Sequence, residues 1–223
     1  MLKDWTKFEK LLLCGSISVI TVLAIIFKSN VLTTVASIFG VLTALFIVKG
    51  KTIGQAFGVA SAILYSILSF RNKFYGEVII YLSLILPLNV MGVISWIKHQ
   101  SKSTNTVEVN KVSKKEWILL SITSVFVFIG LYFLLKYFNT EELIVSTISV
   151  ISSLYAIYLQ VRRSRYSFYF YIANDIVLFV LWGIPVIKGS LLLLPMLVNP
   201  VINFINDSYG VYNWKKLEEK QKN

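Results

Sequence analysis

Long apolar segments, separated by short polar ones, follow one another along most of the chain. A helix needs about 20 mostly apolar residues to cross the roughly 30 Å of hydrocarbon in a bilayer. Eight segments approach or reach this length, over residues 11–27, 31–48, 53–70, 76–97, 117–138, 143–161, 167–187 and 190–206. The pattern therefore predicts an all-α polytopic membrane protein with eight transmembrane helices.

The composition fits a membrane protein and excludes an ordinary soluble domain. Of the 223 residues, 56% are hydrophobic and 15% are charged, whereas soluble domains carry about 25% charged residues. The first apolar segment follows basic residues, as in a signal peptide, but no small-x-small cleavage site comes after it, so we expect a retained helix. Cys14, the single cysteine, lies in that helix and excludes an internal disulfide.

The net charge of +11 is divided unevenly between the two sides of the predicted membrane protein. Of the 22 Lys and Arg residues, 17 fall on the side of both termini and of the polar connector 99–116. The other five are Lys28, Arg71, Lys73, Lys136 and Lys188. The positive-inside rule then predicts cytoplasmic termini in the inner (plasma) membrane. Topology and contact with lipid head groups explain the basic patches, so we expect no nucleic-acid partner.

A short motif occurs twice, at the ends of the fourth and eighth predicted helices. Residues 92–98 read GVISWIK and residues 210–216 read GVYNWKK, so both contain GVxxWxK at an offset of 118. Each copy follows a polar residue three positions earlier, Asn89 or Asp207. Because transporters are often built from duplicated bundles, we predict two parallel three-helix repeats joined by a linker helix and preceded by one extra helix.

This 3+1+3 arrangement divides the chain into five parts. They are an additional N-terminal helix over 1–30, a first three-helix repeat over 31–98, a cytoplasmic connector and linker helix over 99–142, a second repeat over 143–216 and a charged cytoplasmic tail over 217–223. The connector has no apolar period, which marks it as the join between the halves.

The last two predicted helices carry more polar residues than lipid-facing helices tolerate. An acid at the centre of a span costs about 2.5 to 3.5 kcal/mol on insertion scales, so it normally faces a bundle interior or a wet cavity. At helical spacing, one face of each helix collects such residues: Phe168, Tyr171, Asp175 and Trp182 in the first, and Asn199, Asn203 and Asn206 in the second. We interpret the two faces as a substrate site.

Two runs of the chain resemble the PnuC family of vitamin precursor transporters, over about residues 31–216. They are residues 73–96, KFYGEVIIYLSLILPLNVMGVISW, and residues 173–214, which contain ANDIV, VIKG and YGVYNW. The resemblance implies a SWEET-like fold and facilitated diffusion of nicotinamide riboside, with cytoplasmic phosphorylation trapping the vitamin. It also implies a homo-oligomer, expected to be a trimer, and no cofactor or metal.

The chain departs from the family pattern at the expected site. The pattern WxxWxxxN corresponds here to Phe168, Tyr171 and Asp175 in one register, with smaller aromatic rings, or to Ser167, Phe170 and Asn174 in the other. Only the first register keeps aromatic residues at both Trp positions. Asn89 stands where many relatives have Gln, and Leu192 lies near a usual Tyr. These departures leave thiamine or another nucleoside open as alternative substrates.

Recognition of a ribosylated ring requires flat apolar faces for the base and amides for the sugar hydroxyls. The candidate residues are Phe168, Tyr171 and Trp182 for stacking, and Gln55, Asn89, Asn174, Asn199 and Asn203 for hydrogen bonds, with Asp175 in their midst. Alternatively, the amides bond between helices, which is worth about 0.6 kcal/mol each in a membrane. The small residues Gly58 and Gly92 on the first-half faces are expected to pack helices closely.

The sequence contains no constellation for catalysis. It has no GxxxxGKS or GxxxxGKT loop and no HExxH, and its one histidine, His99, lies in the connector. The acids at or inside the ends of the predicted spans, Glu77, Asp175 and Asp207, are too scattered in sequence to form a paired acid and base or a metal cage. A transporter is therefore expected, with a lipid-modifying enzyme, a scaffold or a channel as alternatives. Asp175 is the candidate for proton coupling, although simple facilitated diffusion is favoured.

Overall fold

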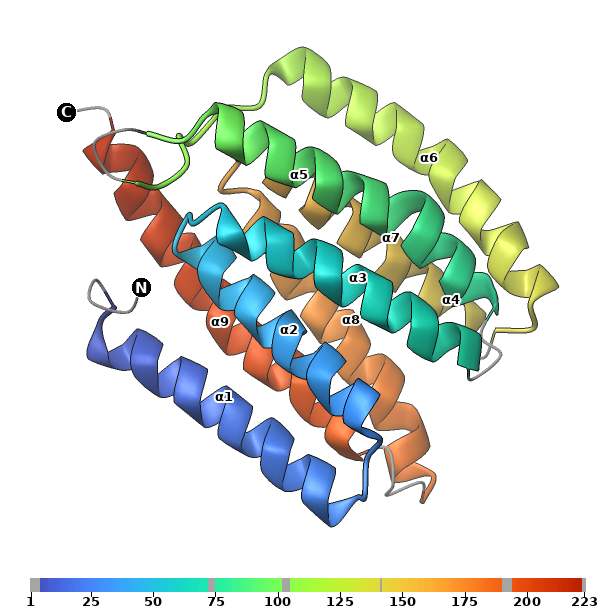
Figure 1. Cartoon of the computed structure of the whole chain (residues 1–223). Helices are drawn as coiled ribbons and strands as arrows, with labels where there is room; N and C mark the ends of the chain where they lie inside the picture. The colour runs from blue at the N-terminus through green and yellow to red at the C-terminus, as the bar shows by residue number, and fades with distance from the viewer. Residues whose placement is uncertain (1–4, 72–74, 102–104, 141, 190–193, 222–223) are drawn as a thin grey trace.

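The computed structural model describes residues 5–71, 75–101, 105–140, 142–189 and 194–221. These residues form helices that run side by side, with α1 at one edge of the bundle and α6 at the other (Figure 1). The elements are α1 (Lys7–Ile26), α2 (Val31–Val48), α3 (Ile53–Arg71), α4 (Tyr75–Ile80), the π-helix η1 (Tyr81–Ile85), α5 (Leu86–Lys98), α6 (Lys114–Tyr137), α7 (Leu143–Val161), α8 (Ser167–Ile187) and α9 (Leu194–Lys220). The predicted all-α fold is confirmed for the described residues.

Most helices begin and end where the sequence indicates. The bounds of α2, α7 and α8 equal the predicted ones. The Asn30 side chain accepts a hydrogen bond from Leu32 N at 2.9 Å and so fixes the start of α2. In contrast, α9 was expected to end at residue 206 but continues to Lys220. The predicted segment 190–206 was bounded by its apolar residues. The helix continues beyond them through polar residues and includes part of the expected tail, 217–220.

The fourth predicted span is irregular. It consists of α4, the π-helix η1 and α5, and Pro87 follows directly after the first residue of α5. Proline has no N–H to donate and crowds the carbonyl four residues earlier, which lies in η1, so a wider turn fits there. The Asn89 side chain donates from Nδ2 to the carbonyl of Ile85 at 3.0 Å and satisfies this last residue of η1.

The distribution of side chains is that of a membrane protein. Large apolar side chains are exposed on the outside, such as Phe126 of α6 at 70%, while Gln55 is fully buried. Six described helical stretches have the length and composition to cross a bilayer: α1, α2, α3, residues 78–98, α6 and α7. An apolar exterior around a polar interior suits a lipid solvent. The protein is thus a multi-pass membrane protein.

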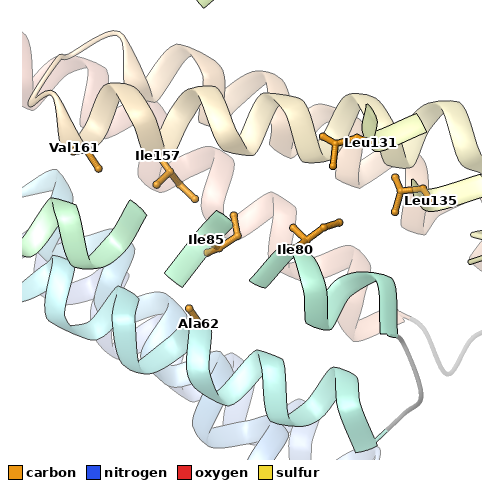
Figure 2. Packing of buried hydrophobic residues seen from close by; sticks show 7 residues of the cluster. All are labelled: Ala62, Ile80, Ile85, Leu131, Leu135, Ile157 and Val161. Carbon is orange, nitrogen blue, oxygen red and sulfur yellow. The ribbon is translucent and has the colours of Figure 1, made fainter. Parts of the chain in front are cut away.

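A buried apolar cluster joins α3, α4, η1, α6 and α7. Figure 2 shows its members, Ala62, Ile80, Ile85, Leu131, Leu135, Ile157 and Val161. A second cluster lies where the ends of several helices meet, and it contains Trp96 of α5, Phe168 of α8 and Trp214 of α9. The two tryptophan rings have centroids 5.6 Å apart. The second cluster therefore brings both halves of the chain together.

Two matching sets of hydrogen bonds flank this tryptophan pair. Trp96 Nε1 donates to the carbonyl of Gln160 at 2.8 Å, and Ser95 Oγ donates to that of Val161 at 2.9 Å. We call this set the Trp96 clamp. In the Trp214 clamp, Trp214 Nε1 donates to the carbonyl of Ile47 at 2.9 Å and Asn213 Nδ2 to that of Val48 at 2.7 Å. One clamp joins α5 to the end of α7, and the other joins α9 to the end of α2.

The outer helices α1 and α6 are attached in related ways. Glu9 near the start of α1 accepts two hydrogen bonds from Lys49 Nζ, each 2.9 Å long, at the end of α2. Glu116 near the start of α6 pairs with Arg162 at 2.6 Å, at the end of α7. Tyr209 of α9 donates a further hydrogen bond of 2.9 Å to Glu9. Each outer helix is thus tied by a glutamate to the basic C-cap of the next helix.

Candidate functional site

The predicted polar faces of α8 and α9 meet because the two helices pack antiparallel. Phe168 near the start of α8 contacts Trp214 near the end of α9, with ring centroids 5.5 Å apart. Its ring also lies against Gly210, where any side chain would clash with it. Phe168 is fully buried in this apolar contact. Stacking of Phe168 on a substrate stays a prediction. In this structure its ring is part of the buried core.

Two turns further along α8, two acids lie together. The carboxyl groups of Asp175 and Asp207 are within hydrogen-bonding range of each other, and both residues are buried, at 4% and 6% exposure. Asn206 Nδ2 donates to Asp207 Oδ1 at 3.2 Å. Among the described residues, Asp175 Oδ2 and Asn206 Oδ1 have no hydrogen-bond partner. The expectation that these acids are too far apart to pair is wrong, because it considered separation in sequence and not the packing of α8 on α9.

Two other predicted site residues of α8 bond to α7. Tyr171 donates its hydroxyl to Gln160 Oε1 at 2.5 Å, and Ser149 Oγ donates to Asn174 Oδ1 at 2.9 Å. Gln160 is the residue whose backbone carbonyl accepts from Trp96 in the Trp96 clamp. Tyr171 therefore connects the polar face of α8 with the contact between the two halves.

In the first half, Gln55 and Asn89 lie where α3 packs closely on α5. The Gln55 amide lies against Gly92, and the Asn89 amide lies against Gly58, so that a Cβ at either glycine would clash. Gln55 is fully buried, and neither Nε2 nor Oε1 has a hydrogen-bond partner in the described part of the chain. Asn89 is 6% exposed. The small residues serve close packing, as expected.

The remaining predicted residues are on α8 and α9. Asn203 lies one turn before Asp207 on α9 and Asn199 one turn earlier still, and both are half-buried. Trp182 belongs to α8, but its side chain lies outside the described part of the structure, as does Leu192. Asp207 is not among the residues predicted for the site. The GVxxWxK repeat placed Asp207 at the position of Asn89, and this was the signal that could have identified it.

Two grooves of about 200 and 390 Å³ lie along α6, away from this polar cluster. Apolar residues such as Leu120, Val125 and Phe128 dominate their walls, which fits contact with acyl chains. Within the described residues, no group of three or more His, Cys, Asp or Glu side chains could hold a metal ion. The buried polar residues of the candidate site offer amides and carboxyl groups for recognition of a ligand.

Buried polar side chains inside a multi-pass helical protein are typical of membrane proteins that bind or carry a small solute. Residues 30–216 match the model of the nicotinamide mononucleotide transporter family. The chain belongs to this family. The resemblance to PnuC proteins, and the expectation of a transporter in place of an enzyme, are confirmed.

Two individual proteins are similar over nearly the whole chain. The nicotinamide riboside transporter PnuC of Neisseria mucosa is 28% identical, and the match covers 97% of this chain and 84% of that protein. A crystal structure of the vitamin B3 transporter PnuC is 27% identical, with a TM-score of 0.81, and the match covers 97% of this chain and 94% of that one. The helical arrangement drawn in Figure 1 is thus similar to that of a solved transporter structure.

Proposed function

We propose that this protein carries nicotinamide riboside across the plasma membrane. The observation that carries the proposal is the set of buried polar side chains in each half, Gln55 and Asn89 in the first and Asp175 and Asp207 in the second, in a chain that resembles a nicotinamide riboside transporter over 97% of its length. The nicotinamide ring of the riboside is a cation, which suits aromatic faces and a buried carboxyl pair. The amides of Gln55, Asn89 and Asn203 are the proposed partners of the ribose hydroxyls.

The same cluster favours the riboside over the mononucleotide named in the family description. A phosphate group would bring nearly two negative charges, and proteins bind phosphates with Arg or Lys. Asp175 and Asp207 make no ion pair with a basic residue among the described salt bridges, which join other acids. Two acids without such a partner would repel a phosphate. Thiamine, which carries a cationic thiazolium ring, and nucleosides are the alternative substrates.

The proposed mechanism is facilitated diffusion with alternating access. The Trp96 and Trp214 clamps join the halves at the end of the bundle where α5 and α9 finish, and breaking them would open that end. Because the sequence has no ATP-binding loop, carriage would follow the substrate gradient. Phosphorylation in the cytoplasm would then trap the vitamin.

The proposed architecture has eight spans in two parallel repeats, 31–98 and 143–216, with 99–142 as connector and linker. The matching clamps support this duplication. The Glu9–Lys49 and Glu116–Arg162 pairs extend it, since α1 is attached to α2 as α6 is attached to α7. We therefore propose that α1 is the counterpart of the linker helix α6. In Figure 1, the start of α1, the connector and the end of α9 lie at one end of the bundle, in keeping with cytoplasmic termini. A homo-oligomer, with a trimer expected from the family, remains a prediction.

A binding titration on purified protein in detergent tests the substrate. Nicotinamide riboside should bind saturably, and nicotinamide mononucleotide should compete at least about tenfold more weakly because of its phosphate. Thiamine and a neutral nucleoside serve as comparison ligands. Saturable binding of thiamine without binding of the riboside would contradict the proposal, and so would preference for the mononucleotide.

A further inference from the structure

The segment between α5 and α6 crosses the end of the bundle from one half of the chain to the other. Val107 N donates to the carbonyl of Gly50, just beyond α2, at 2.8 Å, and Asn110 N donates to the carbonyl of Arg163, just beyond α7, at 2.9 Å. We call residues 107–110 the strap. Figure 1 shows this segment at the end of the bundle where α9 finishes. The two ends of the strap are thus bonded to different halves.

The two carbonyls that accept from the strap occupy equivalent places in the two halves. Gly50 and Arg163 each follow the C-cap of their helix and have positive φ, 65° and 57°. In both turns, the N–H of the next residue donates to the carbonyl five residues before it, at 2.9 Å. This Schellman geometry turns the chain away from the helix at the left-handed residue. Three residues of extended chain span about 10 Å, which matches the roughly 8 to 10 Å between packed helices, so one short strap reaches both turns.

Two side chains hold the strap in place. Val107 is fully buried in the apolar cluster that surrounds the tryptophan pair. Gln221, which directly follows α9, accepts at Oε1 from Val109 N at 2.8 Å and donates from Nε2 to the carbonyl of Val107 at 3.0 Å. Its amide therefore pairs with the strap backbone as a neighbouring strand would. Through Gln221, the strap is bonded to the second half at a second point.

The strap joins the same helix ends as the two tryptophan clamps. The Trp96 clamp ends on the last two residues of α7 and the Trp214 clamp on the last two of α2, and the strap bonds to the turn just beyond each. Helix ends at a protein surface can be satisfied by water, so these turns do not need the strap for their own hydrogen bonds. What the strap adds is a backbone connection between the halves. The halves cannot part at this end while both ends of the strap stay bonded.

We propose that the strap is a conformational lock, which has to leave one half before this end of the carrier opens, and that Gln221 fastens it. The inference rests on the proposed function, in which opening of this end releases the vitamin. The lock acts on how often the end opens and supplies no energy. Transport therefore still stops at equal concentrations, as facilitated diffusion requires.

The rate of thiol labelling on purified protein in detergent measures how often this end opens. Val48→Cys in a Cys14→Ser background places a single thiol in the cluster between the halves, where Val48 is 1% exposed, and a maleimide is the probe. Gln221→Ala removes two strap hydrogen bonds. Because each is worth about two- to tenfold in the opening equilibrium, labelling should be at least about fivefold faster. Lys220→Ala shortens the preceding exposed side chain and should leave the rate unchanged.

A second substitution releases the strap from α7. Asn110→Pro has no N–H to donate to Arg163, so labelling at position 48 should be about two- to tenfold faster. Lys111→Pro places the same ring one residue later, where the N–H makes no hydrogen bond within the described residues, and it should leave the rate unchanged.

Nicotinamide riboside binding, measured on the same proteins, separates the two proposals. Labelling at the parent rate in Gln221→Ala or in Asn110→Pro, with riboside still bound, would overturn the lock while the proposed function survived. Equal acceleration by the two lysine controls would also overturn it. Faster labelling in the strap variants alone, in a protein that does not bind the riboside before substitution, would support the lock and contradict the proposed function.

Discussion

Replacing Gln55 should change stability and binding in opposite directions. Gln55 is fully buried, and its side-chain amide has no hydrogen-bond partner among the described residues. A buried polar group left unpaired costs about 1 to 3 kcal/mol. Leucine has a similar size and no polar atoms, so Gln55→Leu should raise the free energy of unfolding of the ligand-free protein by about that amount. The riboside, in turn, should lose a hydrogen bond and bind roughly five- to hundredfold more weakly.

Thermal unfolding in detergent and a riboside titration measure the two effects. For a chain of this size, 1 kcal/mol corresponds to about 2 to 4 °C in Tm. Asn89→Leu is the matched control on the facing helix, since Asn89 already bonds to Ile85, and its loss should lower Tm. If Gln55→Leu lowers Tm while the riboside binds at wild-type strength, Gln55 is structural and the reasoning fails.

Two matched pairs of substitutions test the architecture by chemical unfolding. Lys49→Met leaves Glu9, at 2% exposure, buried without its ion-pair partner, and should lower the free energy of unfolding by about 3 to 5 kcal/mol. Arg162→Met breaks a pair in which the arginine is 43% exposed, and should lower it by at most about 1 kcal/mol. Equal costs would contradict the burial argument. Trp96→Phe and Trp214→Phe each remove one clamp hydrogen bond and should destabilise by similar amounts, about 1 to 3 kcal/mol. An effect confined to one tryptophan would contradict the equivalence of the clamps.

The sequence predicts the helices well because each is a long apolar run between polar turns. The α2 and α8 segments are correct at both ends. The end of α9 was missed because hydropathy reports where the membrane stops, whereas the helix continues to Lys220 through a segment without proline. The π-helix η1 was not predicted, because its one signal in the sequence was Pro87, which permits a kink without specifying its form.

The site was predicted in its parts but not in its pairing. Periodicity placed Asp175 on the polar face of α8, and the structure confirms that it is buried. Which residue of α9 faces it depends on the register between two helices, which periodicity within one helix does not determine. Asn206 and Asp207 are only about 100° apart around α9, so both fit the same stripe. For Phe168, periodicity placed an aromatic ring on the predicted substrate face, but the ring packs against Trp214. The pattern alone does not distinguish a ring that stacks on a ligand from one that packs in the core.

Uptake of radiolabelled nicotinamide riboside into proteoliposomes tests the transport claim most directly. Without an imposed membrane potential, the riboside should enter until its inside and outside concentrations are equal and then stop. Asp175→Asn and protein-free liposomes provide the comparisons. Uptake no faster than in protein-free liposomes, with protein that is folded and inserted, would contradict the account.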